Sequence, residues 1–431
     1  MNGKRTTPGI SRRHFLKTSA ATSLSLSLAS GLNKVYAAGS DKIRVGVLGC
    51  GGRGLYDSTN CVNSAENVEI VAVGDLFQDR IDSFLGYYKA NLPGKINVTP
   101  ETCFTGFDAC EKLLACDIDL VMMTQTPHFR PRHFRAAIEA GKHVFLEKPV
   151  AVDPVGVRSV IETAKLADEK KLTVLAGTQM RRLAPLVEIM KHIHNGDMGK
   201  ILGGQCCRLG DGMMSWGPAT RKAEWSDMEW QIRRWLFHTW LSGDFIVEQH
   251  VHNLDLINWA LNAHPIQCTA VGGRQARTGE LYADAYDHIA VEYVYPDGIR
   301  IEYKGAQIDR ISDRNDQRLF GTKGNAYFDF GRSVIEGQNP FEYQGETPDP
   351  CLRQHAEQID AIRNGTPLNE AVRIAESTLT AIMGRMSAYT GKSMSWNWVM
   401  NASKLDLTPA HYTFGDLPEP MVAIPGVTPL V

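Results

Sequence analysis

The stretch VGVLGCGGRG, Val45–Gly54, places three glycines directly after a short apolar run. The glycines stand at positions 49, 51 and 54, and a helix-like pattern follows to about Val62. A strand, a G-x-G-x-x-G turn and a helix in this order predict a dinucleotide-binding turn. In such a turn Gly49 permits the tight bend and Gly51 lets the backbone approach a pyrophosphate. Gly54 lets the helix and the strand pack closely.

The predicted turn also attracts negative charge. The N-terminus of the following helix presents free N–H groups and the positive end of the helix dipole. Gly52 and Arg53 belong to the same turn, and Arg53 adds a cation. A second apolar run, Val68–Asp75, ends in an acid 21 residues past Gly54. A carboxylate there accepts hydrogen bonds from ribose hydroxyls and repels a 2′-phosphate, so Asp75 favours NAD over NADP as the cofactor.

Short apolar runs go on alternating with helical patterns as far as Gly177. Further runs lie within residues 117–127, 142–149 and 172–177, and helical patterns lie within 133–141 and 153–171. Continuous apolar strands that alternate with helices indicate a parallel sheet covered on both faces. The sequence therefore predicts an α/β fold, a doubly wound Rossmann domain over residues 41–177 that binds NAD(P).

The pattern changes in the second part of the chain. Residues 288–305 and 318–330 read as hairpins, and residues 353–390 return to helix. These patterns predict a C-terminal α+β domain over residues 178–431 with a mostly antiparallel sheet. The proline-rich end of the chain is expected to wrap on the surface.

The first residues have the pattern of an export signal. Arg12-Arg13 precede Phe-Leu-Lys, an apolar stretch follows, and Val35–Ala38 offers small residues for a peptidase. This arrangement resembles a twin-arginine signal peptide, here residues 1–38, which the twin-arginine export machinery reads. We therefore expect a periplasmic protein that folds before export. Proteins that use this route often carry a bound cofactor when they are exported. An ordinary basic leader is the alternative.

Composition excludes some classes of partner. The formal net charge is −2, so no basic excess is present to neutralise phosphates, and nucleic-acid binding is not expected. No run of 18 apolar residues occurs, so no membrane span is expected. The nine cysteines lack CxxC or metal-type spacing, and we expect most of them to be buried as small apolar residues, with pairing among Cys103, Cys110 and Cys116 left open.

Two short stretches follow predicted parallel strands and therefore border the predicted nucleotide crevice. The first, Thr124–His133, contains Thr126 and His128, which can contact the ribose and phosphates of a cofactor. A capping threonine and a solvated histidine are the alternative. The second contains Glu147, Lys148 and Pro149. A lysine at that crevice can hold a substrate hydroxyl or shift the pKa of a neighbour, whereas the plainer interpretation is a surface lysine.

A third stretch, Ser242–Asn262, carries an acid and a histidine at helical spacing. Glu248 and His252 are four residues apart and share one face if that segment is helical. Such a pair suits proton transfer, with His252 as the base. His250, Glu248 and His252 on a strand would instead suggest a metal set, but no fourth ligand is apparent, and we expect no metal. A structural histidine is the remaining alternative.

These stretches, in this order, resemble the glucose–fructose oxidoreductase/inositol dehydrogenase (Gfo/Idh/MocA) family over nearly all of the chain after the leader. The matching pieces are GVLGCGGRG with Asp75, EKP, EQHVHNLD and FGTKGNAYF. The resemblance implies that Lys148 and His252 are the catalytic lysine and histidine. The family's acid, usually Asp, maps onto Glu248. Gln179 and the segment Tyr286–His288 become weaker candidates for the pocket wall, with Gln179 near the cofactor.

The resemblance also implies an activity. It suggests an NAD(P)-dependent oxidoreductase that moves a hydride from a secondary hydroxyl of a sugar, cyclitol or glycoside to the nicotinamide. It further implies an open C-terminal sheet that forms a homo-oligomer, a dimer or a tetramer. Export would favour tightly bound NAD, and some relatives use transient oxidation to cleave glycosides. An NAD-dependent glycoside hydrolase and a non-catalytic carbohydrate-binding protein therefore remain alternatives.

Overall fold

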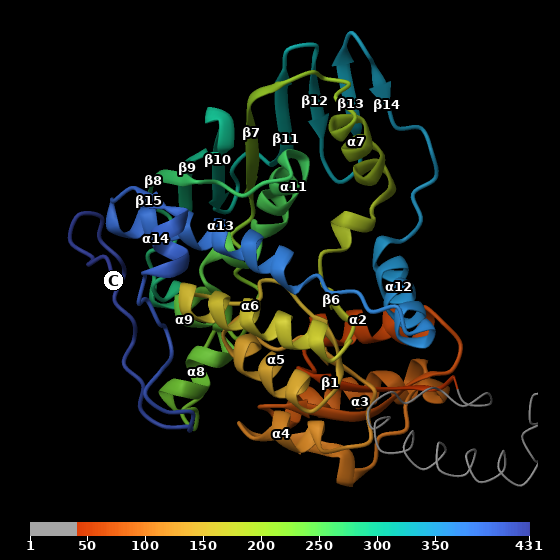
Figure 1. Cartoon of the computed structure of the whole chain (residues 1–431). Helices are drawn as coiled ribbons and strands as arrows, with labels where there is room; N and C mark the ends of the chain where they lie inside the picture. Colours follow the sequence, from red (N-terminus) through yellow and green to blue (C-terminus); the bar gives the residue numbers. More distant parts are fainter. Residues whose placement is uncertain (1–40) are drawn as a thin grey trace, which may run out of the picture. The chain divides into compact units, whose positions relative to one another are not determined.

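The computed structural model describes residues 41–431, coloured in Figure 1. The expected signal peptide, residues 1–38, lies outside these described residues. The strands form two sheets, one of six strands and one of nine.

The first sheet is parallel throughout. Its strands stand in the order β3-β2-β1-β4-β5-β6, and every neighbouring pair is parallel. This is the strand order of a dinucleotide-binding Rossmann sheet, and it confirms the predicted fold. The strands are β1 (Ile43–Leu48), β2 (Val68–Asp75), β3 (Cys103–Thr105), β4 (Leu120–Met123), β5 (His143–Leu146) and β6 (Val174–Ala176). The helices of this half are α2 (Gly52–Asn63), α3 (Gln78–Asn91), α4 (Ala109–Leu114), α5 (Arg130–Glu139) and α6 (Pro154–Glu169).

The second sheet is mixed and mostly antiparallel, as expected. Its order is β14-β13-β12-β11-β7-β10-β9-β8-β15. Of the strand pairs described in this second sheet, only β10 with β7 is parallel. Both expected hairpins form, β9 with β10 and β11 with β12. The strands are β7 (Ile201–Gly210), β8 (Gln267–Gly273), β9 (His288–Val294), β10 (Arg300–Gln307), β11 (Arg314–Gly321), β12 (Gly324–Phe328), β13 (Ser333–Gly337), β14 (Phe341–Glu342) and β15 (Met394–Ser395).

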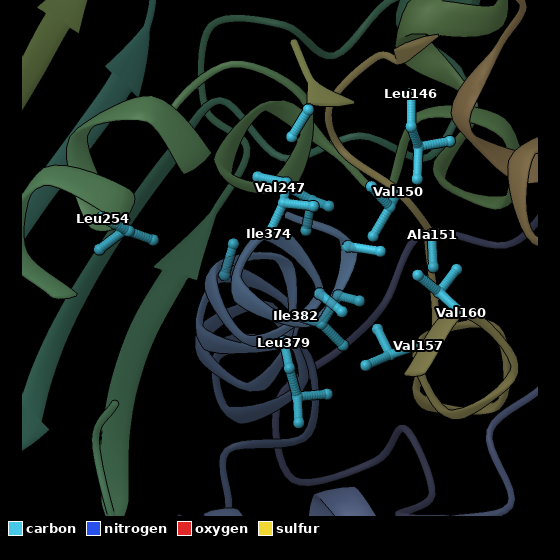
Figure 2. Packing of buried hydrophobic residues seen from close by; sticks show 14 of the residues in the cluster. Leu146, Val150, Ala151, Val157, Val160, Val247, Leu254, Ile374, Leu379 and Ile382 are labelled. Carbon is cyan, nitrogen blue, oxygen red and sulfur yellow. The ribbon is translucent and has the colours of Figure 1, made fainter. Parts of the chain in front are cut away.

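The helix α13 (Ala371–Thr390) connects the cores of the two halves. Sixteen of its residues are buried, and they include polar side chains such as Ser377 and Arg385 as well as apolar ones. Figure 2 shows this helix, which carries Ile374 and Ile382, with Leu254 on one side and Val157 of α6 on the other. The remaining helices of the second half are α7 (Ala184–His194), α8 (Asp227–Arg233), α9 (Thr239–Ser242), α10 (Phe245–Glu248), α11 (Val251–Leu261), α12 (Pro350–Asn364) and α14 (Trp396–Asn401).

Two late segments return to the nucleotide-binding half. Helix α12 lies beside α2 (Figure 1), and the Gln358 side chain donates to the carbonyl oxygen of Val144 in β5 at 2.9 Å. The segment 403–431, which contains no helix or strand, descends from α14 toward α8 (Figure 1). None of the helices within residues 41–431 has the length and apolar character needed to cross a bilayer.

Candidate active site

A cavity of about 690 Å³ lies where β1, β2, β4, β5 and α10 end and α11 begins. The crevice outside the carboxyl ends of the strands is where doubly wound folds bind ligands. Its wall includes most of the residues expected from the sequence. These are Gly49, Gly51, Gly52, Arg53, Asp75, Thr126, Glu147, Lys148, Glu248 and His252.

The glycine turn forms one end of the cavity. Gly49 has a φ of +98°, and a Cβ on it would lie 2.5 Å from the backbone nitrogen of Gln125. A Cβ on Gly54 would lie 1.9 Å from the carbonyl oxygen of Gly49, so the close approach of helix and strand requires glycine. By contrast, a Cβ on Gly51 or Gly52 would meet nothing within 4 Å. That open space lies in front of the N-terminus of α2, which has no side-chain cap, so the turn fits a pyrophosphate.

Asp75 lies at the end of β2, on the cavity wall. Its carboxylate accepts hydrogen bonds from the N–H of Cys50 at 2.7 Å and of Phe77 at 3.0 Å. Burial raises the pKa of Asp75, and these two N–H donors oppose the rise. The Asp75 carboxylate therefore holds the backbone of the glycine turn in position. It also lines the part of the cavity where the ribose of a cofactor would lie.

Arg53 does not point a free charge at the cavity. Its guanidinium donates to Oε1 of Glu147 at 2.6 Å and lies 2.9 Å from Oδ2 of Asp57. Although burial opposes it, Arg53 together with Lys148 holds the pKa of Glu147 below its usual value. Burial and the neighbouring Glu147 raise the pKa of Asp57 instead. Arg53 and Glu147 therefore lock α2 to the end of β5, and Gly177 makes room for the Glu147 carboxylate, which would lie 2.2 Å from an added Cβ.

Lys148 joins the two halves of the protein at the cavity. Its Nζ donates to the carbonyl oxygen of Glu248 at 2.6 Å and to Oε1 of the same residue at 3.1 Å. Both side chains are less than one tenth exposed. A lysine ammonium has three N–H donors, so one remains for a ligand.

His252 lies in the first turn of α11 and lines the same cavity. Burial lowers the pKa of His252 well below its usual value, and the positive charges of Lys148 and Arg208 lower it further. A neutral imidazole results, which can accept a proton. The helical condition for a shared face of Glu248 and His252 is not met, because α10 ends at Glu248 and α11 begins at Val251. The two side chains nevertheless reach the same cavity.

Gly54, His128 and Gln179 do not line the cavity, and neither does the segment Tyr286–His288. His128 is buried against Trp240 and Phe129, and its Nε2 is 2.8 Å from the hydroxyl of Tyr412. Burial lowers the pKa of His128 to about 4. Gln179 lies in a short turn after β6, and its Oε1 is enclosed without a hydrogen-bond partner among the described residues. The chain around His128 stays at the cavity, since Thr126 and Phe129 both line it, but the His128 side chain packs away from it.

Several residues on the wall were not singled out from the sequence. Arg208 comes from β7, and Gln249 follows Glu248 directly. Met213, Trp216 and Trp235 line the cavity from the second half, and the Trp216 and Trp235 rings are 6.5 Å apart. The only sequence signal for these residues is the richness of residues 178–240 in Trp, Arg and Met.

The structure also bears on metals and cysteines. Within residues 41–431, no three His, Cys, Asp or Glu side chains gather as metal ligands would. His250, the neighbour of the expected base, instead places its Nδ1 2.5 Å from the hydroxyl of Tyr303. The part of the chain that the structure describes contains all nine cysteines, none in a disulfide, and seven of them are buried.

Comparisons with known proteins agree with this geometry. Residues 43–178 match the Gfo/Idh/MocA family, described as "Oxidoreductase family, NAD-binding Rossmann fold". Inositol 2-dehydrogenase 3 of Saccharopolyspora erythraea is 26% identical over 260 residues, 60% of this chain and 65% of that protein. A 2,7-anhydro-N-acetylneuraminate hydratase of Escherichia coli is 24% identical over 64% of this chain and 68% of its own length.

A third relative, a glycosyl hydrolase family 109 protein of a Shewanella strain, is 26% identical over 46% of each chain. The chain thus spans less than two thirds of the length of the first of these relatives and less than half of the third.

Solved structures show the same fold. The aldose–aldose oxidoreductase of Caulobacter crescentus, complexed with glycerol, is 15% identical with a TM-score of 0.63 over 82% of this chain and 99% of that chain. An oxidoreductase of Agrobacterium radiobacter, in complex with NAD+, L-tartaric acid and magnesium, is 13% identical with a TM-score of 0.62 over 82% of this chain and 98% of that chain.

Proposed function

We propose that this chain, whose residues 43–178 belong to the Gfo/Idh/MocA oxidoreductase family, is an NAD-dependent enzyme acting on a carbohydrate. The reaction is hydride transfer from the carbon that bears a secondary hydroxyl of a sugar, cyclitol or glycoside, while the hydroxyl loses its proton. One observation carries the proposal. The glycine turn, Lys148 and His252 line one cavity. A dinucleotide whose pyrophosphate is held at the turn can therefore bring its nicotinamide to a substrate held by the second half.

The residues present fit a dinucleotide. The open space before Gly51 and Gly52 and the uncapped N-terminus of α2 suit the pyrophosphate, and Asp75 suits ribose hydroxyls. The Asp75 carboxylate repels a 2′-phosphate, so we expect NAD rather than NADP. When bound, NAD supplies the hydride acceptor.

The chain's own residues supply orientation and proton transfer. His252 is neutral because burial and nearby cations hold its pKa low, so it can take the proton of the substrate hydroxyl. Lys148 donates its third N–H to the same oxygen and stabilises the charge that develops there. Glu248 fixes Lys148 through both its carbonyl and its carboxylate.

The test uses the full chain purified without added cofactor. Denaturation should release nicotinamide in a one-to-one ratio, and incubation of the native protein with sugars, cyclitols and glycosides should change the nicotinamide absorbance. A protein that carries no nicotinamide and binds added NAD weakly, or that leaves the nicotinamide unchanged with every compound, would contradict the proposal.

We also propose that the cofactor is tightly retained, because aromatic side chains line the nucleotide end of the cavity. Phe77, Phe107 and Phe129 line that end, and residues of the 403–431 segment pack behind them. The Phe414 ring lies 5.1 Å from Phe107, and the Tyr412 ring lies 5.6 Å from Phe129. Release of a bound nucleotide through this wall would require the segment to detach. Retention suits the periplasmic location that we propose from the twin-arginine signal, because free NAD is a cytoplasmic resource.

A glycoside hydrolase that oxidises its substrate transiently is the second candidate. The relative in glycosyl hydrolase family 109 favours it, as does retention, because a retained cofactor must be restored in each turnover. It predicts release of a free sugar without external NAD or acceptor. A non-catalytic carbohydrate-binding protein predicts binding with no change in nicotinamide or product.

We also propose a homo-oligomer. The nine-stranded sheet leaves apolar side chains exposed on three of its strands, with Val271 71%, Leu202 58% and Phe320 41% exposed. Sedimentation should show a dimer or a tetramer, and a monomer at micromolar concentration would contradict this.

A further inference from the structure

Arg208 is a cation on the cavity wall without an acidic partner. It projects from β7, and its Nη1 donates to the carbonyl oxygen of Gln249 at 2.8 Å and to Oδ1 of Asn253 at 3.3 Å. Among the described residues no carboxylate lies within ion-pair distance of it. Its Nε and Nη2 have no partner within residues 41–431, and they are not enclosed.

The charges at the catalytic end do not balance. Lys148 and Arg208 are both near Glu248, whose carboxylate already pairs with Lys148 at 3.1 Å. Among Lys148, Arg208 and Glu248, one positive charge is therefore left over where the substrate would bind. A guanidinium removed from bulk water without a counter-ion is costly, unless a ligand brings the negative charge.

Arg208 is also held in a fixed orientation. Of its two acceptors, Gln249 lies in the break between α10 and α11, and Asn253 lies in the first turn of α11. Asn253 is itself fixed by a hydrogen bond from its Nδ2 to Oδ1 of Asn315 at 2.7 Å. A planar guanidinium held on one side, with donors free on the other, is suited to bidentate binding of a carboxylate.

The position of Arg208 separates it from the cofactor's phosphates. Its acceptor Gln249 follows Glu248, which binds Lys148, and His252 feels the charge of Arg208. The pyrophosphate is expected at the other end of the cavity, at the turn from Gly49 to Gly54. The free donors of Arg208 therefore serve the substrate.

We propose that Arg208 binds a carboxylate of the substrate, which makes the substrate a sugar acid or a glycoside of one. This assignment rests on the proposed function, since it names the substrate class of the same site. Trp216 and Trp235 give the rest of the wall apolar faces on which a sugar ring can pack.

The experiment compares matched pairs that differ only in one carboxylate. Glucuronate, galacturonate and their methyl glycosides are titrated into the NAD-loaded full chain beside glucose, galactose and the corresponding methyl glycosides. Binding is measured by calorimetry, and turnover by nicotinamide absorbance. We expect the acidic member of at least one pair to bind about 10- to 100-fold more tightly, the range for hydrogen bonds to a charged partner.

The variants locate the effect. Arg208→Gln should remove the preference by weakening the acidic compound alone, and Arg208→Lys should restore part of it. Arg300→Gln, at an exposed side chain on β10 of the same sheet, should leave the preference unchanged. Equal nicotinamide content in all variants shows that each is folded, and Arg208→Lys keeps the test open if Arg208→Gln fails to fold.

The outcomes separate the two proposals. Equal or tighter binding of every neutral compound, no binding of any acid, or an equal loss for both members in Arg208→Gln would overturn the assignment to Arg208. Binding of an acidic sugar that depends on Arg208, with no change in nicotinamide for any compound, would support the assignment and contradict the proposed function.

Discussion

The Nζ of Lys148 lies 2.6 Å from the carbonyl oxygen of Glu248 and 3.1 Å from its Oε1. Lys148 follows β5 in the nucleotide-binding half, and Glu248 ends α10 in the other half. The two residues are 100 positions apart in sequence, so this contact exists only in the folded protein. It fixes the lysine between the glycine turn and His252, which is why the site depends on the relative position of both sheets.

Substitution of this pair should reduce turnover without removing the cofactor. In Glu248→Gln the carbonyl contact remains while the charge near Lys148 is lost, so kcat should fall about 10- to 100-fold. Lys148→Met removes the donor to the substrate oxygen and should cost about 100- to 10,000-fold. Both are measured by nicotinamide absorbance under single turnover.

The control for the pair is Lys191→Met, which removes a surface lysine paired with Glu188. It should retain full activity, and all three variants should retain nicotinamide. A Lys148→Met variant as active as Lys191→Met would remove Lys148 from the mechanism.

The pH profile should report the lowered pKa of His252. The neutral imidazole is the active form, so the rate of substrate oxidation should rise as pH passes upward through a pKa below the ordinary histidine value. The rate should therefore be level near neutrality. Burial is the largest cause of the low pKa, and Lys148 is the next. In Lys148→Met the acid limb should move to higher pH, whereas in Lys191→Met it should stay. An acid limb at or above the ordinary histidine value in the unmodified protein would be incompatible with this account.

The glycines of the turn should respond differently to alanine. Gly54→Ala puts a methyl group 1.9 Å from a backbone oxygen and should lower stability strongly. Gly51→Ala meets nothing within the chain and should leave the melting temperature of the cofactor-free protein nearly unchanged. It should nevertheless weaken NAD binding, because the methyl group occupies the space before the helix N-terminus.

Gly86→Ala in α3 also meets nothing within 4 Å and lies away from the cavity, so it is the matched control for NAD binding. In thermal unfolding it should raise the melting temperature slightly, because alanine favours a helix interior over glycine. Calorimetry with NAD and thermal unfolding distinguish the three variants. NAD binding by Gly51→Ala at the affinity of Gly86→Ala would argue against a pyrophosphate at this turn.

The segment 403–431 should govern how long the nucleotide stays bound. Tyr412→Ala with Phe414→Ala removes rings that pack behind Phe107 and Phe129, and such aromatic pairs contribute about 0.5–1.5 kcal/mol each. We expect NAD to dissociate about 10-fold faster, measured as nicotinamide lost during dialysis. Met421→Ala, at a side chain 91% exposed in the same segment, is the control. Equal retention in both variants would show that the segment does not hold the nucleotide wall.

Local pattern was enough to predict the nucleotide-binding half. Alternating apolar runs and helices specify a parallel sheet, because each strand and its following helix must bury one another within a short stretch of chain. The glycine spacing could be interpreted for the same reason, since the steric demands at Gly49 and Gly54 come from neighbours in one strand–turn–helix unit. The hairpins at β9–β10 and β11–β12 likewise follow from local alternation.

Long-range packing decided what pattern could not show. Arg53 was expected to face a pyrophosphate, but Glu147, 94 residues away, binds it. His128 was expected at the cofactor, but Tyr412 and Trp240 enclose it. No motif singled out Arg208 in the sequence, because a single arginine on a strand indicates a binding site only when the folded structure leaves it without a counter-ion. Charged groups and aromatic rings find their partners only when the two halves pack together. Burial then sets the energy of each contact, and the spacing of residues in the sequence does not show which groups will meet.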